Sequence, residues 1–450
     1  MRTHYKYLHG AALSAIMAVL LASARPSSGA EAAPSADSLT LDQVIRQVVE
    51  KNDRVAAARF MQEAAERRVA SAGVWDDPML MLGAQNVPTN FDFTMDPMTM
   101  KMVGLSQNIP YAGHKGLERK AAQAEARAAE EDRRGTEIDL VAAAKTAYYD
   151  AYYLQQNLRE FNLQREILEE VYTSSISKLR TNQTGQEDVL SSQAEIWRLE
   201  TTILSTEQEI TAAVARLNSL RGESPDAPLS PLAAPPEIPL LESADTWIAA
   251  AEVNYPPLAR LNRQAEAYDF SARASRRMAW PMLNVEASYG FRSGYDIGMD
   301  GMSEARDDMV SFQAKLSVPI FSGGKQRAMA RSMEAMQRGT EAEAAQFRRD
   351  IKADLVTLYE RARRLSQTSA SYRNQIIPAT EDAFRSALAG YTANRTTFAS
   401  LSSYSLALYR DRITANQLAN DLALTLIEVD RYTKGTAAWD SPDTANEQSK

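Results

Sequence analysis

The sequence predicts a mainly α-helical chain that also contributes to a transmembrane β-barrel, with long coiled-coil helical hairpins and four strands per chain. Three observations support this fold class. The N-terminus has the pattern of an export signal, yet no later segment is apolar enough for a transmembrane helix. The chain repeats itself once. Each copy contains two alternating segments followed by a very long helical stretch.

The N-terminus is predicted to be a secretory signal peptide. Arg2 and Lys6 give it a positive start, and the apolar run 11–24 is too short to span a bilayer. Small residues follow, so cleavage is expected after Ala24 or Ala30. Because no later segment offers about 18 consecutive apolar residues, the mature chain is expected to be soluble, peripheral or a β-barrel.

Composition excludes several classes of function. The absence of cysteine rules out disulfides, thiolate sites and a lipidated N-terminal cysteine. Histidine occurs only at His4, His9 and His114, and the first two leave with the signal, which argues against His-based catalysis or a multi-His metal site. A net charge of -8 argues against nucleic-acid binding. Hydrolase and P-loop motifs are absent, so we expect neither an enzyme nor a cofactor.

Five short segments recur in the same order, and the offset between copies rises from 202 to 211 residues. One match alone is weak evidence, but five ordered matches predict two equivalent units. The matched segments are 50–52 and 252–254, 77–78 and 280–281, 106–110 and 315–319, 111–115 and 320–325, and 190–192 and 401–403.

The repeat divides the chain into five parts. A linker rich in proline separates the two units, because six prolines there exclude regular helix. The polar C-terminal tail is expected to be disordered. The predicted parts are a signal peptide 1–30, a first repeat 40–221 (a helix, a strand pair 79–109 and a helical hairpin 114–221), the linker 222–242, a second repeat 243–432 (a helix, a strand pair 282–318 and a helical hairpin 325–432) and the tail 433–450.

The first repeat begins with a capping-box pattern at Thr40 and Gln43, which predicts a helix to about Ala72. Strands are predicted at 79–85 and 98–109. In the second repeat, apolar and polar residues alternate cleanly over 283–291 and 310–318. Such alternation gives one apolar and one polar face, as in a sandwich or in a transmembrane barrel. Strand lengths of about ten residues favour the barrel.

A helical rod is predicted at 114–180, which contains no proline and would extend for roughly 100 Å. Flanking residues such as Val141, Tyr148 and Ile167 suggest a second contact face, as a closed ring of helices requires. A coiled-coil seam in register between the repeats runs through Leu140, Ala144, Ala147, Ala151, Leu154, Leu158 and Phe161, and through Ile351, Leu355, Leu358, Ala362, Leu365, Ser369 and Tyr372.

Each rod is expected to reverse in a short polar turn, at 181–185 and 392–396, before a returning helix. Gly185 and Asn394 are the residues expected to adopt the left-handed backbone there.

The strands impose a further requirement. Four strands cannot close a barrel, and open edges in lipid leave unpaired amides. Three chains would supply twelve strands, so a homotrimer is predicted.

The strand-to-helix junctions 105–113 and 316–324 resemble the Pro–aromatic–x–Gly turns of the TolC-like outer-membrane efflux family. Residues 185–195 are similar to that family's hairpin tip, and the resemblance extends over 40–432. It implies a trimer with a twelve-stranded outer-membrane barrel and an α-helical periplasmic tunnel. It also implies a periplasmic adaptor (membrane fusion) protein and an inner-membrane efflux pump as partners. The chain would then be a passive exit duct in the outer membrane, with a large periplasmic portion.

The resemblance also implies a gate and adaptor contact at the hairpin tips. Arg395 stands where the family often places a tip arginine, but serines replace its usual acidic ring, leaving Asp188 as the candidate carboxylate. The alternative is that these are solvated turn residues. The candidates are Gly185, Glu187, Asp188, Asn394, Arg395, Thr396 and Ser402.

Methionines crowd the first strand pair, at Met79, Met81, Met95, Met98, Met100 and Met102. Thioether sulfur suits Cu(I) or Ag(I), which suggests a heavy-metal duct like those of the CusC/CzcC-like branch. Met95, Met98 and Met100 are the candidate ligands. The preferred alternative is that methionine is a flexible apolar filler at lipid-facing and loop positions.

Two other functions remain open. A duct for type I protein secretion would use the same fold. A periplasmic coiled-coil adaptor or scaffold would explain the helices, but it would not explain two duplicated strand pairs.

Overall fold

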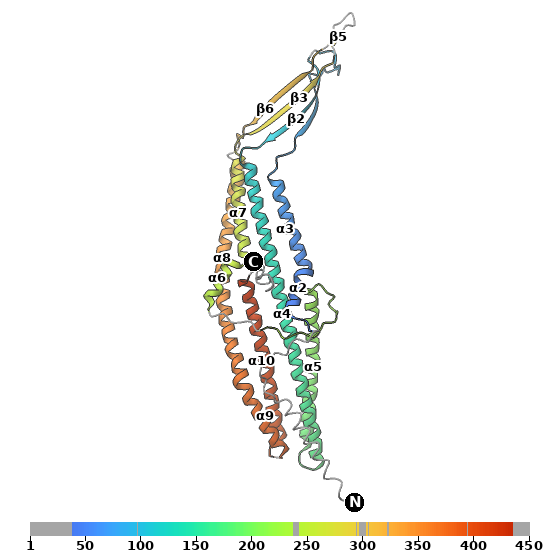
Figure 1. The fold of residues 1–450 in the computed structure, drawn as a ribbon, viewed down its shortest axis with the longest axis vertical. Coiled ribbons are helices and arrows are strands. Elements are labelled where there is room, and N and C mark those ends of the chain that lie inside the picture. The colour runs from blue at the N-terminus through green and yellow to red at the C-terminus, as the bar shows by residue number, and fades with distance from the viewer. Residues whose placement is uncertain are drawn as a thin grey trace, which may run out of the picture.

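The computed structural model describes residues 38–96, 98–236, 243–293, 295–296, 303–304, 306–321, 324–393 and 395–434. The predicted signal peptide, the end of the linker and the tail after residue 434 lie outside the described residues. The chain is long and narrow, with a sheet at one end and two helical hairpin tips at the other (Figure 1).

The first repeat contains four helices and two strands. Its predicted first helix is divided in two, because Asn52 ends one helix and caps the next. The Asn52 side chain accepts a hydrogen bond from the Arg54 amide at 2.9 Å and donates one to the Leu220 carbonyl at 2.8 Å. The elements are α2 (Leu41–Lys51), α3 (Asp53–Ala72), β1 (Met79–Gln85), β2 (Met100–Ile109), α4 (His114–Arg180) and α5 (Gln186–Leu220).

The second repeat has the same order of major elements. Its first helix is also divided, at Tyr255, and Pro256 begins the following helix, where a missing amide is tolerated. The elements are α6 (Ala244–Asn254), α7 (Pro256–Arg277), β3 (Met282–Phe291), the short β4 (Tyr295–Asp296) and β5 (Ser303–Glu304), β6 (Met309–Ser317), α8 (Lys325–Ser371), the π-helical turn η1 (Tyr372–Ile376), α9 (Ile377–Thr392) and α10 (Phe398–Thr433).

The π-helical turn interrupts the long helix of the second repeat only. Pro378 follows it, and proline lacks the amide that an α-helix needs at that position. The segments α8, η1 and α9 have 47, 5 and 16 residues, together one more than the 67 of α4. Buried Leu365 and Phe384 lie 19 residues apart, although five α-helical turns take about 18. The turn therefore absorbs one extra residue.

The four long strands form one antiparallel sheet in the order β1-β2-β3-β6. The central pair, β2 with β3, joins the two repeats over a register from Lys101 opposite Phe291 to Ile109 opposite Leu283. Within the described part of the chain, β1 and β6 each pair on one side only, so the sheet has two open edges.

Helix α4 is the centre of the helical body. It packs against α3 and α7 nearer the sheet and against α5 and α10 nearer the tips (Figure 1). Near the middle, the linker returns to the start of the first repeat, where Leu39 bridges Leu232. The Tyr148 hydroxyl of α4 lies 2.8 Å from the carbonyl oxygens of both Leu39 and Ala233, so this junction is held against α4.

Candidate functional site

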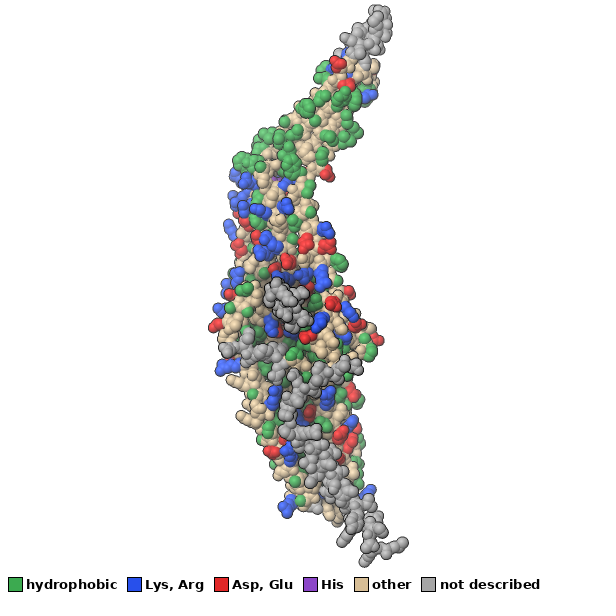
Figure 2. Space-filling model, viewed as in Figure 1, with side chains coloured by type: hydrophobic (Ala, Val, Ile, Leu, Met, Phe, Trp, Pro, Cys, Tyr) green, Lys and Arg blue, Asp and Glu red, His purple; other side chains and the backbone are tan. Residues whose placement is uncertain are grey.

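The sheet has one apolar and one polar face. On the apolar face, Phe312 is 79% exposed and Leu82 is 75% exposed, whereas Glu286 on the opposite face is 7% exposed and pairs with Lys315 at 2.5 Å. Figure 2 shows apolar side chains gathered over the sheet, while charged side chains lie over the helices. The apolar face comprises Leu80, Leu82, Val103, Leu105, Leu283, Val285, Tyr289, Phe291, Val310, Phe312 and Leu316.

The methionines of the strands lie on the polar face. The register places Met79 opposite Ser106 and Met102 opposite Gly83, on the side opposite Leu80 and Leu82. They therefore do not belong to the apolar face.

The predicted ligands Met95, Met98 and Met100 contact different partners. The Met95 sulfur accepts from the Asn90 amide nitrogen at 3.2 Å, and the Met98 sulfur accepts from Arg292 Nη2 at 3.5 Å. The Met100 sulfur lies over Gly290. A guanidinium on Met98 is a poor neighbour for a metal cation.

The first hairpin tip differs from the prediction at Gly185. That residue has φ of -82° and caps α5 in an extended conformation, so its predicted left-handed backbone is wrong. The left-handed residue is Asn182, with φ of 61°. Glu187 and Asp188 lie in the first turn of α5, where negative charge is favoured. The Thr184 hydroxyl donates to the Asp188 carboxylate, which fixes that side chain within the turn.

The second tip is held by backbone bonds. The amides of Arg395 and Thr396 both donate to the Gly390 carbonyl, at 2.8 and 3.2 Å. The Thr396 side chain occupies the space where a Cβ on residue 390 would lie. Ser402 is partly buried and lines a cavity of about 420 Å³ between α4, α5 and α10. Asn394 lies outside the described residues.

A contact between the two tips was missed by the sequence analysis. The Lys178 ammonium on α4 donates to the backbone carbonyl of Tyr391 on α9 at 2.7 Å. It also lies 3.4 Å from the centre of the Tyr391 aromatic ring. The Ser175 hydroxyl is 3.3 Å from the Tyr391 hydroxyl. Burial lowers the pKa of Lys178, and the Asp188 carboxylate opposes that shift. The candidate carboxylate thus acts on a lysine that ties the two hairpins together.

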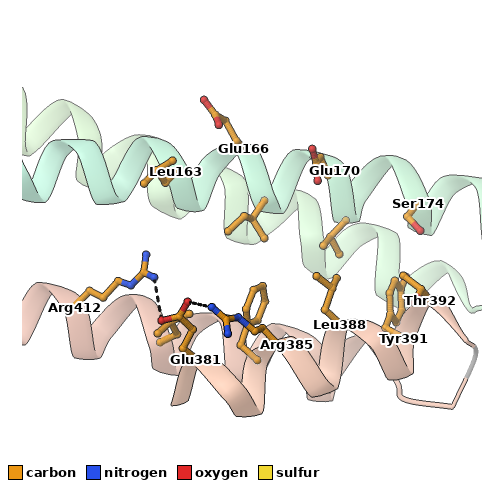
Figure 3. Close-up of a pocket in the computed structure, with 14 residues that line it drawn as sticks. Leu163, Glu166, Glu170, Ser174, Glu381, Arg385, Leu388, Tyr391, Thr392 and Arg412 are labelled. Carbon is orange, nitrogen blue, oxygen red and sulfur yellow. Dashed lines mark hydrogen bonds and ion pairs between the residues drawn. The ribbon is translucent and has the colours of Figure 1, made fainter. Parts of the chain in front are cut away.

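A groove lies beside this contact, between α4 and α9 (Figure 3). Its volume is about 170 Å³, and Phe384 and Leu388 supply apolar lining. Glu381 lies between two arginines, with Arg385 at 2.6 Å and Arg412 at 3.8 Å. Glu166, Glu170 and Ser174 line its α4 side. An apolar floor with charged walls suits an amphipathic helix.

Polar pairs connect α4 to α10 along the hairpins. The Lys145 ammonium contacts the Asp430 carboxylate at 3.2 Å, and both side chains are 9% exposed. Burial lowers the pKa of Lys145, and Asp430 opposes that shift. Further pairs are Asp150 with Asn420, Asn157 with Asn416, and Gln164 with Ser405.

Among the residues that the structure describes, every helix falls short of the length or apolar character needed to cross a bilayer. Over the same residues, no group of three or more His, Cys, Asp or Glu side chains is arranged to hold a metal ion.

Solved structures share this fold. The chain is similar to the outer-membrane channel OprN (17% identity, TM-score 0.71, covering 89% of this chain and 91% of that one). It is also similar to the channel protein CusC (15%, 0.70, 88% and 92%) and to the outer membrane protein VceC of Vibrio cholerae (14%, 0.71, 88% and 96%). At these identities the likeness shows the fold, and it confirms the mainly helical architecture with four paired strands.

A search of curated proteins finds no match to this chain. Residues 44–223, which make up most of the first repeat, match the family described as outer membrane efflux protein. This match supports the predicted location in the outer membrane. The family match and the shared fold together support the resemblance found in the sequence: residues 44–223 form an outer membrane efflux protein domain, and the likeness of fold extends over most of the chain.

Proposed function

We propose that this chain is one protomer of a trimeric outer-membrane channel, a passive exit duct rather than an enzyme. Solutes would reach it from an inner-membrane pump through a periplasmic adaptor. The observation that carries the proposal is the open sheet, which has an exposed apolar face, a polar face and two unpaired edges.

The edges require partners. In lipid, each unpaired amide or carbonyl costs several kcal/mol, so β1 and β6 are stable only when other strands pair with them. Joining β1 of one protomer to β6 of the next in a ring of three gives a closed barrel of twelve strands. The apolar face then meets lipid, and the polar face lines the channel.

The helical body supports the same arrangement. Helix α8 is buried along a single seam, which includes Ile351, Leu355 and Ala362. Its remaining surface is uncovered within one protomer. We propose that neighbouring protomers pack against that surface and close the tunnel.

The hairpin tips are the proposed gate and adaptor contact. Lys178 and Tyr391 hold the two hairpins together, and Asp188 acts on that lysine. Opening would separate these contacts. The groove of Figure 3 is the proposed seat of an adaptor helix, because its floor is apolar and its walls are charged.

For the solute that the channel carries, we propose heavy-metal cations. The observation that favours them is the placement of the strand methionines on the polar face, which would line the channel.

The trimer is tested by cross-linking. The chain contains no cysteine, so any disulfide cross-link must form between the introduced cysteines. One is placed on β1 as Gly83→Cys, and the other is moved along β6 as Ser311→Cys, Gln313→Cys and Lys315→Cys. We expect one β6 position to give covalent dimers and trimers in outer-membrane fractions. A protein that stays monomeric and soluble without detergent would refute the proposal.

Conductance tests the duct and its gate together. The trimer in a planar bilayer should be nearly closed, and Lys178→Met should raise its conductance. Arg180→Met is the matched control, because it removes a tip cation outside the contact with Tyr391.

Susceptibility of a deletion strain to copper, silver, zinc, cobalt and antibiotics identifies the solute class. A strain that loses only protein export would favour type I secretion.

A further inference from the structure

We propose that Met100, Met102 and Met309 form a binding site for a soft monovalent cation, Cu(I) or Ag(I), around Gly290 on the polar face of the sheet. The proposal rests on the exit duct described above and deepens it by naming a solute class.

The sheet register places two of these methionines on either side of one glycine. Met102 on β2 is directly opposite Gly290 on β3, and Met309 on β6 is directly opposite the same glycine on its other side. Opposed residues of antiparallel strands share a face, and neighbouring strands lie about 4.8 Å apart, so the Cβ atoms of Met102 and Met309 are roughly 10 Å apart across Gly290. Both thioethers therefore rise from the polar face on either side of a residue that has no side chain.

Met100 supplies the third sulfur. A Cβ built on Gly290 would lie 2.7 Å from the Met100 sulfur, so this thioether occupies the space that a side chain at residue 290 would fill. Met100 is 6% exposed, whereas Met309 is 39% exposed. One ligand is thus fixed in position, and another remains open to solvent.

The ligand set selects the ion. Thioether sulfur is soft and uncharged, so it favours Cu(I) and Ag(I) over hard cations that prefer oxygen. Arg292 lies two residues after Gly290, just past the end of β3. Its Nη2 contacts the Met98 sulfur, outside the proposed site, and its backbone amide donates to the Asp308 carboxylate, which places a negative charge nearby. Lys315 pairs with Glu286. Three neutral ligands, one of them exposed, give a site that a moving ion can both enter and leave, as a conducting path requires.

Direct binding to the purified trimer tests the site. The protein is prepared in detergent without a histidine tag, and Cu(I) is titrated against a coloured Cu(I) chelator. We expect one Cu(I) per protomer, with only sulfur neighbours in X-ray absorption. Because the chain has no cysteine, those sulfurs are thioethers. The triple variant Met100→Leu, Met102→Leu and Met309→Leu should lose this binding.

Two further variants separate the site from its surroundings. The pair Met79→Leu and Met282→Leu removes polar-face methionines at the other end of the sheet and should leave affinity unchanged. Gly290→Ala keeps all three sulfurs but displaces that of Met100. It should weaken binding at least about tenfold, the low end of what even outer-shell partners contribute.

Equal Cu(I) binding by the triple variant, or nitrogen and oxygen neighbours around the bound ion, would overturn the site. Conductance and cross-linking on the same preparations separate the two proposals. A conducting trimer that binds no Cu(I) refutes the site and leaves the duct standing. A preparation that binds Cu(I) at these sulfurs but neither conducts nor cross-links refutes the duct and leaves the site standing.

Discussion

The long helices of the two repeats share one sequence pattern but have different surroundings. Leu140 and Ala144 of α4 correspond to Ile351 and Leu355 of α8, and all four are buried. Beside this shared seam, α4 also packs against α2, α3 and α10, so Val141, Tyr148 and Tyr149 are buried as well. Helix α8 is buried along the seam alone. The repeated pattern therefore fixes one contact, and position in the protomer decides the others.

The difference extends to the way each helix accommodates its length. Helix α4 is continuous for 67 residues, whereas its counterpart carries one more residue and a π-helical turn. A helix packed against several neighbours cannot rotate its faces without losing contacts. A helix that contacts neighbours along one seam can absorb an extra residue locally.

Deletion of one residue should show this contrast most strongly. Removing Asn162 rotates the rest of α4 by about 100° and takes Leu168 and Val171 out of their contacts. We expect a loss of more than about 4 kcal/mol, since each buried apolar side chain contributes about 2 kcal/mol. Trimer yield and thermal unfolding measure the effect.

The matched control removes Asn374 from the π-helical turn together with Pro378→Ala, which lets the turn close into an ordinary α-helix. Trimer yield should then stay near that of the unmodified chain. Equal damage from both deletions would contradict the interpretation of the turn as one absorbed residue.

Breaking an ion pair on α4 should lower the free energy of unfolding more than breaking one on α8. Asp430→Ala removes the carboxylate that contacts buried Lys145 and should cost about 3 kcal/mol. Glu360→Ala removes the partner of Arg363 on α8, a pair 4.0 Å apart with both side chains more than half exposed, and should change little. Denaturant unfolding in detergent compares them. The double variant Lys145→Met, Asp430→Leu should recover most of the loss, because the buried charges leave together.

The smallest expected effect concerns Tyr148. Replacing it with phenylalanine removes a donor to two carbonyl groups and should cost about 1 kcal/mol at neutral pH. Burial raises the pKa of Tyr148 from 10.0 to about 12. A raised pKa stabilises the fold fully below pH 10.0, and this stabilisation is lost as the pH rises through 12. As the pH rises from 10.0 to about 12, the free energy of unfolding should therefore fall less steeply in the Tyr148→Phe variant than in the unmodified chain. An unchanged slope would count against a buried phenol.

Several elements were predictable because local patterns define them. The capping box at Thr40, the span of α4 and the alternation of β3 and β6 appear in the structure where the sequence placed them. The divisions of the first helices were missed, although Asn52 is a good capping residue and Pro256 a good first helical residue. Their signals were weaker than the apolar periodicity around them.

The functional details depended on contacts between distant segments. Leu190 and Leu401 belong to a matched sequence pair, yet Leu190 is 61% exposed and Leu401 is 1% exposed. The extra residue of the π-helical turn lies between the in-register stripes and the second tip. A local match could not show that shift, nor the contact of Lys178 with Tyr391.

By itself, the sequence determined that the chain is a duplicated unit of paired strands and long helices, because periodicity and turn residues act over a few positions. It also predicted that the strands need other copies, since backbone groups in lipid must be paired. Only the tertiary structure decided which residues meet on the polar face. The three methionines lie on β2 and β6, and the pairing of both strands with β3 sets them around Gly290.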